Sequence, residues 1–388
     1  MNKHMSLFSQ VVQIFPRNDF EKAVRELQVE RHARGFRSWD QFVAMLFCQL
    51  GKANSLREIT NGLATCEGKL VHLGIRAPKR STLAYANAHR PWQLYQRMFF
   101  YILSRSKAAA ARHGRKFRFK HKLYSIDSSV IDLCASLFPW ATYRRTKGAI
   151  KLHLQLDHDG YLPEFAYIRE GSVHDCKVVG QFDFRPDCIY LFDRGYTDYQ
   201  WYAQLCEDEI YFVTRLKDNA DYKVVERSDT SKHKNIRCDQ IIELQGYYTS
   251  KACPFRLRRV KVYDREEKRY IVLLTNLFHL SCKTISDLYK ERWNIEILFK
   301  TLKQYLKIKT FVGTSENALH IQIWTALIAL LLLKFLKLKS SFAWSLSNLA
   351  ALLRMNLFTH RDLWVWINSP FETPPLHPAP KQLKLALL

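Results

Sequence analysis

The succession of short apolar segments between residues 119 and 216 constrains the fold of this chain more than any other feature. Alternating or continuous apolar segments predict β-strands, and a 3.6-residue period predicts helices. The predicted strands are 123–127, 149–156, 162–169, 188–192 and 210–215, and the predicted helices are 174–183 and 198–208. Three strands joined by tight turns, followed by helix, strand, helix and strand, indicate a mixed sheet of five strands with helices against it.

The charge of the chain points to a polyanionic partner. Sixty Lys and Arg against 36 Asp and Glu leave a formal net charge of +24, which indicates nucleic acid or an anionic membrane surface, with a merely basic protein as the plain alternative. The most apolar stretch, 321–333, is short for a membrane span and precedes Lys334, so it predicts a buried helix and no membrane partner. Nine cysteines without a CxxC pair, and no signal-peptide pattern, predict a reduced, cytoplasmic protein.

The N-terminal region contains two short helices with recognisable start signals. Ser55 and Glu58 have the spacing of a capping box, and Ser81 is placed to cap a second helix that ends before Pro91. Two such helices, the second opening with a basic turn, fit either a helix-turn-helix that reads DNA or an ordinary helical subdomain. The basic segment 112–122, with interleaved Phe, fits either a segment that follows a nucleic-acid backbone or a solvated connector.

These patterns predict an α/β protein whose core has the strand order of the ribonuclease H-like fold. Polar turns and alternating segments after the fifth strand predict an insertion, and a long helix from about 284 to 306 returns the chain to the core. The expected parts are a helical DNA-binding domain at 1–118, a first core segment at 119–216, a β-rich insertion at 217–283, a second core segment at 284–345 and a helical or irregular C-terminal region at 346–388.

Two aspartates directly follow predicted strands. Asp127 ends the first strand and Asp193 ends the fourth, and the predicted topology makes these strands neighbours. Carboxylates at the carboxyl ends of adjacent parallel strands converge at one edge of a sheet. A carboxylate beside a buried strand is costly unless it is paired or binds a metal ion. Asp132, Asp159 and Asp175 are interpreted instead as turn or cap residues.

Convergent carboxylates suit phosphodiester chemistry. That chemistry needs a deprotonated oxygen nucleophile, in-line geometry and neutralisation of crowded negative charge. Two hard cations about 4 Å apart can supply all three. Mg²⁺ takes oxygen ligands, so several carboxylates must point to one place.

A third acid comes from the long predicted helix. On a helical projection Tyr289, Arg292, Glu296 and Lys303 share one stripe. A single acid between bases on a helix is, by itself, typical of a solvated face. The apolar stripe a quarter-turn away is formed by Leu288, Ile295, Leu302 and Leu306.

The spacing Tyr289-x2-Arg292-x3-Glu296-x6-Lys303 matches the YREK signature of a large group of bacterial transposases, insertion-sequence family four. With Asp127 and Asp193, the chain resembles these enzymes in their DDE triad. The stretches 36–63 and 79–91 are similar to the N-terminal domain of the family, which also carries an insertion at the predicted place. The resemblance therefore covers nearly the whole chain.

The resemblance implies a DNA transposase in which Asp127, Asp193 and Glu296 are the catalytic residues and bind two ions of Mg²⁺ or Mn²⁺. Its partners would be double-stranded DNA, as terminal inverted repeats and target, and a second copy of the chain in a synaptic complex on the bacterial nucleoid. One strand would be hydrolysed at each end, the 3′-hydroxyl would attack the opposite strand to give a hairpin, and the reopened end would join target DNA. The resemblance assigns phosphate contacts to Tyr289, Arg292 and Lys303.

One departure from the family and two other functions bear on this interpretation. Relatives stack a flipped base on a Trp of the insertion, whereas residues 217–280 contain no Trp. Tyr247, Tyr248 or Phe255 are the aromatic substitutes. The competing functions are a ribonuclease H-like nuclease without strand transfer and a catalytically silent DNA-binding protein.

Overall fold

The computed structural model describes residues 5–376 except 31–32, 34, 115, 118, 135, 145–146, 172–174, 231–233, 266–267, 307 and 309–310. The last part of the expected irregular tail, 377–388, lies outside the described residues. The chain forms two compact units, Met1–Arg112 with Thr301–Leu388, and His113–Lys300. Residues 301–345, which the sequence placed with the core, therefore group with the N-terminal helices.

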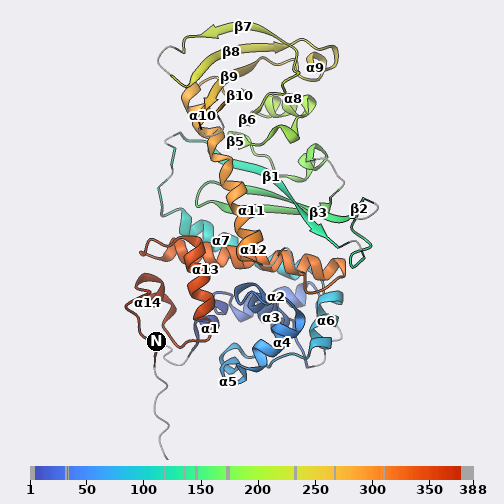
Figure 1. Cartoon of the computed structure of the whole chain (residues 1–388), viewed down its shortest axis with the longest axis vertical. Helices are drawn as coiled ribbons and strands as arrows, with labels where there is room; N and C mark the ends of the chain where they lie inside the picture. Colours follow the sequence, from blue (N-terminus) through green and yellow to red (C-terminus); the bar gives the residue numbers. More distant parts are fainter. Residues whose placement is uncertain are drawn as a thin grey trace, which may run out of the picture. The chain divides into compact units, whose positions relative to one another are not determined.

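Helices build the first unit around one long apolar helix (Figure 1). α12 (Glu316–Lys339) packs against α3, α6, α7 and α13, and every side chain from 321 to 333 is buried. Among the described residues, α12 is the one helix long and apolar enough to cross a membrane, but its burial confirms the predicted core helix. The other helices are α1 (Leu7–Val12), α2 (Arg17–Glu26), α3 (Ser38–Leu50), α4 (Leu56–Ala64), α5 (Glu67–Leu70), α6 (Arg80–His89), α7 (Gln93–Ala110), α13 (Leu346–Met355) and α14 (Leu363–Asn368), with the 3₁₀ helix η1 (Val71–Leu73).

The helix start signals are partly confirmed. Ser55 caps α4, because its hydroxyl accepts the Glu58 backbone N–H at 3.1 Å. The predicted cap at Ser81 is wrong, since the extended cap conformation falls at Lys79, with φ −72° and ψ 145°. α6 therefore begins at Arg80, and Ser81 lies inside its first turn.

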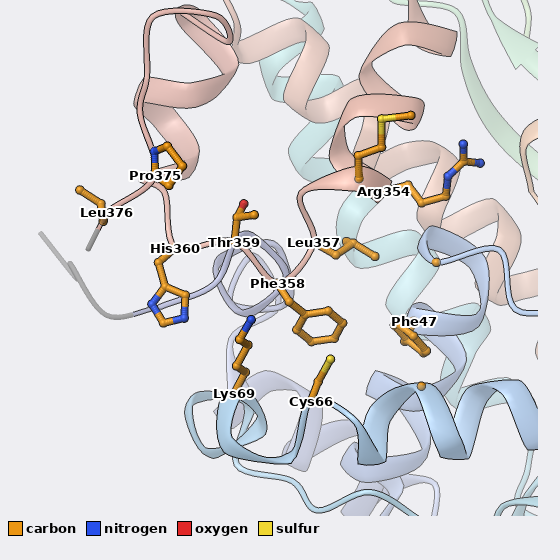
Figure 2. Close-up of a pocket in the computed structure, with 13 residues that line it drawn as sticks. Phe47, Cys66, Lys69, Arg354, Leu357, Phe358, Thr359, His360, Pro375 and Leu376 are labelled. Carbon is orange, nitrogen blue, oxygen red and sulfur yellow. The ribbon is translucent and has the colours of Figure 1, made fainter. Parts of the chain in front are cut away.

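Segments from both ends of the chain build the helical unit. The backbone N–H of Leu7 donates to the carbonyl of Thr359 at 3.0 Å. A nearby cavity of about 670 Å³ is lined from both segments, and Figure 2 shows Phe47 and Phe358 together at its wall, with ring centroids 5.8 Å apart. The segment after α13 is thus part of this unit's structure.

A ten-stranded mixed sheet forms the framework of the second unit (Figure 1). The strand order is β2-β3-β1-β5-β6-β10-β9-β8-β7, and β4 also pairs with β3. β1 with β5 and β5 with β6 are parallel, and the other pairs are antiparallel. The strands are β1 (Lys122–Leu133), β2 (Thr142–Arg144), β3 (Lys147–Asp157), β4 (Leu162–Glu170), β5 (Cys188–Leu191), β6 (Tyr211–Arg215), β7 (Tyr222–Ser228), β8 (Ile236–Leu244), β9 (Leu257–Asp264) and β10 (Arg269–Thr275).

The helices of this unit include two between the core strands. The helix predicted at 198–208 is confirmed as α8 (Tyr199–Glu207), and the one predicted at 174–183 is the 3₁₀ helix η2 (Asp175–Gln181). The predicted insertion consists of β7 to β10 and α9 (Tyr247–Ala252). Because β10 pairs with β6, these strands extend the core sheet and cover an edge of β6 that would otherwise be open.

The two faces of the central strands pack against different helices. Leu123 of β1 and Leu191 of β5 pack with Leu288 of α10 (Cys282–Glu291). Phe192 packs on the opposite face with Tyr202 of α8. Because side chains alternate along a strand, odd-numbered residues of β1 and β5 face α10.

Arg258 joins the inserted strands to the segment that precedes α10. Its guanidinium donates to both carboxylate oxygens of Asp239, at 2.8 and 2.7 Å, and to the Leu277 carbonyl at 3.1 Å, and both charged side chains are buried. Arg258→Met should destabilise this unit by about 3–5 kcal/mol, because it leaves a buried carboxylate without its partner. Adding Asp239→Leu should recover most of the loss. Calorimetry of the full chain checks this, and equal melting temperatures for the single and double variants would contradict it.

Candidate active site

The sequence predicted Asp127 at the end of its strand, but the structure places it within β1. The strand continues past it to Leu133 along β3. The parallel partner β5 pairs with β1 only over residues 122–125. Asp127 therefore lies where one edge of β1 loses its partner, on the face that packs against α10. Its Oδ1 accepts the backbone N–H of Ser128 at 2.8 Å.

Asp193 lies just beyond β5 and level with Asp127. The register pairs Ser125 with Leu191, and the same offset sets Asp127 beside Asp193 on the α10 face. Asp193 Oδ1 accepts the backbone N–H of Gly195 at 2.8 Å and caps the 3₁₀ helix η3 (Arg194–Tyr196). Two carboxylates thus share the edge at which the sheet opens.

The single long helix predicted from 284 to 306 is two helices, α10 and α11 (Trp293–Tyr305), interrupted at Arg292. The backbone N–H of Arg292 donates to the Tyr289 carbonyl, three residues back, at 3.2 Å. The Asn294 side chain donates to the Glu291 carbonyl at 3.0 Å. The first bond tightens the turn at the junction. The second satisfies the Glu291 carbonyl, which in a continuous helix would accept a backbone N–H.

The junction places Arg292 and Glu296, with Tyr289, on the face of the sheet that carries Asp127 and Asp193. Arg292 Nη1 lies 3.3 Å from Asp127 Oδ2, and Nη2 lies 2.8 Å from Glu296 Oε1. The guanidinium carbon is 5.6 Å from the centroid of the Tyr289 ring. The Arg292 and Asp127 side chains are 11% and 16% exposed, so this ion pair is screened less by water than a surface pair, whereas Glu296 is 35% exposed.

The electrostatics of the site favour additional positive charge. Burial raises the pKa of the Asp127 carboxyl to about 7, although Arg292 and the Ser128 N–H lower it, and the charges of Asp193 and Glu296 raise it further. One guanidinium therefore does not compensate the desolvation and mutual repulsion of these acids. A cation of higher charge beside them would favour the ionised form of Asp127.

The donor set fits a hard divalent cation, although the acids are not gathered into a finished site. In the part of the chain that the structure describes, no three acidic, histidine or cysteine side chains are arranged to hold a metal ion. The guanidinium of Arg292 instead contacts both Asp127 and Glu296. All three acids offer carboxylate oxygens, which are the ligands that Mg²⁺ and Mn²⁺ prefer.

Lys303, the fourth residue of the predicted stripe, lies on α11 seven residues after Glu296 and beyond the boundary between the two units. The apolar stripe of the same helices is confirmed. Its four leucine and isoleucine side chains, at positions 288, 295, 302 and 306, are buried.

Sequence reasoning missed a second polar group beside the aspartates. Asp175, expected to be a cap or turn residue, accepts the Ser128 hydroxyl at 2.8 Å and lies 3.2 Å from Lys151 Nζ. A β-carbon added to Gly195 would lie 3.5 Å from Asp175 Oδ2 and 2.9 Å from Asp193 Oδ1, so the two acids flank this glycine. No spacing rule in the sequence links residue 175 to residue 193.

The aromatic residues of the insertion divide into two kinds. Tyr247 and Tyr248 on α9 are 69% and 82% exposed. Phe255 is partly buried and packs against the core cluster on the α8 face. The two tyrosines are therefore accessible from solvent, although Lys251 lies over the Tyr247 ring, and Phe255 is not.

The family of the chain follows from comparison with known proteins. Residues 118–332, more than half of the chain, match the family model described as "Transposase DDE domain", and residues 3–76 match a domain of unknown function (DUF4372). The chain is 31% identical over 309 residues to "Putative transposase y4zB" of Sinorhizobium fredii, covering 79% of this chain and 84% of that protein. It is 30% identical over 260 residues to "Probable transposase for insertion sequence element IS5377" of Geobacillus stearothermophilus, covering 66% and 67%.

A chain with these carboxylates and this match belongs to the DDE transposase family. It is an insertion-sequence transposase of bacterial type, an enzyme that acts on DNA with the help of divalent metal ions. Among solved structures it resembles a piggyBac transposase synaptic complex with hairpin DNA, with 12% identity, a TM-score of 0.44, and coverage of 91% of this chain and 79% of that one. That likeness is too distant to support an argument.

Gly195 offers a test of how closely Asp193 is placed. Gly195→Ala should lower DNA cleavage by about tenfold or more, because the new methyl group would displace the Asp193 carboxylate. End-DNA binding and melting temperature should stay near those of the wild type. Gly180→Ala is the matched control, since a β-carbon there meets no atom within 4 Å. Equal cleavage rates for the two variants would contradict the assignment of Asp193.

Proposed function

We propose that the second unit contains a ribonuclease H-like catalytic core in which Asp127, Asp193 and Glu296 bind two divalent ions, Mg²⁺ or Mn²⁺. The inserted strands extend this core, and the helical unit carries the DNA-binding domain. The observation that supports the proposal most is that Arg292 contacts both Asp127 and Glu296, which come from a strand and from a helix distant in sequence, while the strand register sets Asp193 beside Asp127.

The proposed reaction is phosphoryl transfer at the ends of an insertion element. When bound, the metal ions would activate the attacking oxygen and neutralise charge on the phosphate. Water would attack a phosphodiester at each end and release a 3′-hydroxyl and a 5′-phosphate. The 3′-hydroxyl would then attack a phosphodiester of the opposite strand, forming a hairpin, and after hydrolysis of the hairpin it would attack target DNA.

The basic and aromatic residues of the signature would hold the DNA during these steps. Arg292, which lies over the Tyr289 ring, offers a planar fork to a phosphate, and Lys303 offers a point charge. The exposed rings of Tyr247 and Tyr248 would supply the stacking surface that a hairpin needs in place of the Trp of relatives. Two copies of the chain would synapse two ends, in the cytoplasm and on the nucleoid.

The triad is tested by isosteric substitution. Asp127→Asn, Asp193→Asn and Glu296→Gln should each abolish Mg²⁺-dependent cleavage of cognate end DNA, because each removes a charged ligand without changing side-chain size. Binding of the same DNA should persist. Gel assays of cleavage and mobility shifts measure the two properties separately. A variant that cleaves at the wild-type rate would exclude its residue from the site.

The competing functions separate in the same assay. A nuclease without strand transfer would release cut ends but yield no joined product with target DNA. A silent DNA-binding protein would bind ends and cut nothing at any Mg²⁺ or Mn²⁺ concentration.

We further propose that α6 reads the terminal inverted repeats. α6 stands between two hollows of about 920 and 470 Å³, and its exposed side includes Arg80, Ser81 and Tyr85, the last 68% exposed. A helix flanked by basic side chains suits entry into the major groove with phosphates on either side. The charged residues lining the hollows are Arg17, Arg37, Asp40, Glu67, Arg76 and Lys79 in the larger, and Arg57 and Arg80 in the smaller.

Loss of a base contact from α6 should weaken specific binding more than general binding. Arg80→Ala and Tyr85→Ala should each raise the Kd for end DNA by about 5- to 150-fold, the equivalent of about 1–3 kcal/mol. Affinity for scrambled DNA should change much less. Fluorescence anisotropy with both DNAs measures this, with Lys22→Ala on α2 as the control. If both DNAs lose affinity equally, α6 does not read sequence.

A further inference from the structure

Glu291, which directly precedes Arg292, is a buried carboxylate surrounded by donors. Its Oε1 lies 2.5 Å from Lys116 Nζ, and its Oε2 accepts from the Tyr161 hydroxyl at 3.2 Å and from the Asn294 amide at 3.1 Å. The neighbouring His158 and the Lys116 ammonium lower its pKa to about 2 in spite of burial. Glu291 is therefore charged at neutral pH, and its hydrogen bonds hold the end of α10.

The neighbours Tyr161 and His158 come from the turn between β3 and β4. Gly160 and Tyr161 both have positive φ, +85° and +54°. This conformation is unfavourable for tyrosine and persists only where surrounding contacts hold it. The hydrogen bond from the Tyr161 hydroxyl to Glu291 is a contact that holds Tyr161 in this conformation.

His158 connects the same turn to β1. Its Nε2 lies 2.7 Å from the Ser125 hydroxyl, its Nδ1 lies 3.8 Å from Glu291 Oε2, and its backbone N–H donates to the Leu123 carbonyl at 3.1 Å. Ser125 precedes Asp127 by two residues, so both side chains are on the α10 face of β1.

Two polar bridges therefore run side by side from β1 to the helix junction. In the first, Ser125 bonds to His158, whose other ring nitrogen faces Glu291 at 3.8 Å. The second joins Asp127 through Arg292 to Glu296. The first is the more buried, since the His158 and Glu291 side chains are 7% and 8% exposed.

We propose that Glu291, Tyr161 and His158 form a positioning clamp that sets the α10–α11 junction against β1 and so places Arg292 and Glu296 opposite Asp127. These three are positioning residues and touch no reacting atom. The inference rests on the proposed triad, since it assigns the clamp to the placement of Glu296. A displacement of about 1 Å at a reacting group can slow a reaction about 100-fold, so a clamp one residue from Arg292 has a large effect.

Conservative variants of the clamp test the proposal. Tyr161→Phe and Glu291→Gln should each lower the single-turnover rate of end cleavage by about 10- to 100-fold, as does loss of groups that orient metal ligands. The Mg²⁺ concentration for half-maximal rate should rise several-fold, and the Kd for end DNA should stay within about twofold. The double variant should be no slower than the worse single variant, because the bond that Tyr161→Phe removes ends on the carboxylate that Glu291→Gln alters. Without DNA, the rise in melting temperature caused by Ca²⁺ should shrink in each variant.

The matched control is Glu164→Gln on β4. Glu164 is also a buried glutamate with a partly exposed cation, Arg185, 3.3 Å away, but it lies outside the two bridges. Its variant should lose melting temperature without changing the Mg²⁺ requirement. Wild-type cleavage rates in the Tyr161 and Glu291 variants would overturn the clamp. So would a Glu164→Gln variant that loses as much cleavage rate as they do. Unimpaired cleavage by Asp127→Asn and Glu296→Gln would instead overturn the proposed triad itself.

Discussion

The short parallel pairing of β1 with β5 is the constraint on which the rest of the site depends. It aligns Asp127 with Asp193, and it ends before either residue is reached. Beyond that point, in the described part of the chain, the strand that pairs with β1 is β3, so the sheet opens beside the two acids. Their carboxylates accept backbone N–H groups of Ser128 and Gly195, which lie at this opening. The acids are therefore fixed by strand pairing and local hydrogen bonds before any ligand is present.

The charge gathered at this opening explains the ion pairs around it. Three carboxylates and one guanidinium leave two negative charges when all are ionised, and burial in a protein makes such an excess costly. Burial is the main cause of the raised pKa of Asp127, and the charges of Asp193 and Glu296 raise it further. In the proposed function, a divalent ion beside these acids would offset more of this negative charge than Arg292 does.

The sequence allowed the core strands to be predicted because their apolar residues alternate, as in β3, or form short apolar runs, as in β5. It did not reveal the continuation of β1, since Asp127, Ser128 and Ser129 interrupt that alternation where the strand borders the site. The break at Arg292 was hidden as well, because the segment is made of ordinary helix-forming residues and Asn294 contacts Glu291 only in the fold. The position of Asp175 was hidden for the same reason, because its contact with Ser128 exists only in the folded chain.

The placement of the third acid depends on the inserted strands. Only six residues, 276–281, connect the end of β10 to the start of α10, so the position of β10 determines where that helix begins. β10 is held by β6 on one side and β9 on the other, and Arg258 of β9 bonds to carbonyls within the connecting segment. A change of register in the insertion would therefore move α10, and with it Arg292 and Glu296, relative to Asp127. The insertion is accordingly part of the framework that forms the site, whatever contacts its outer strands make with DNA.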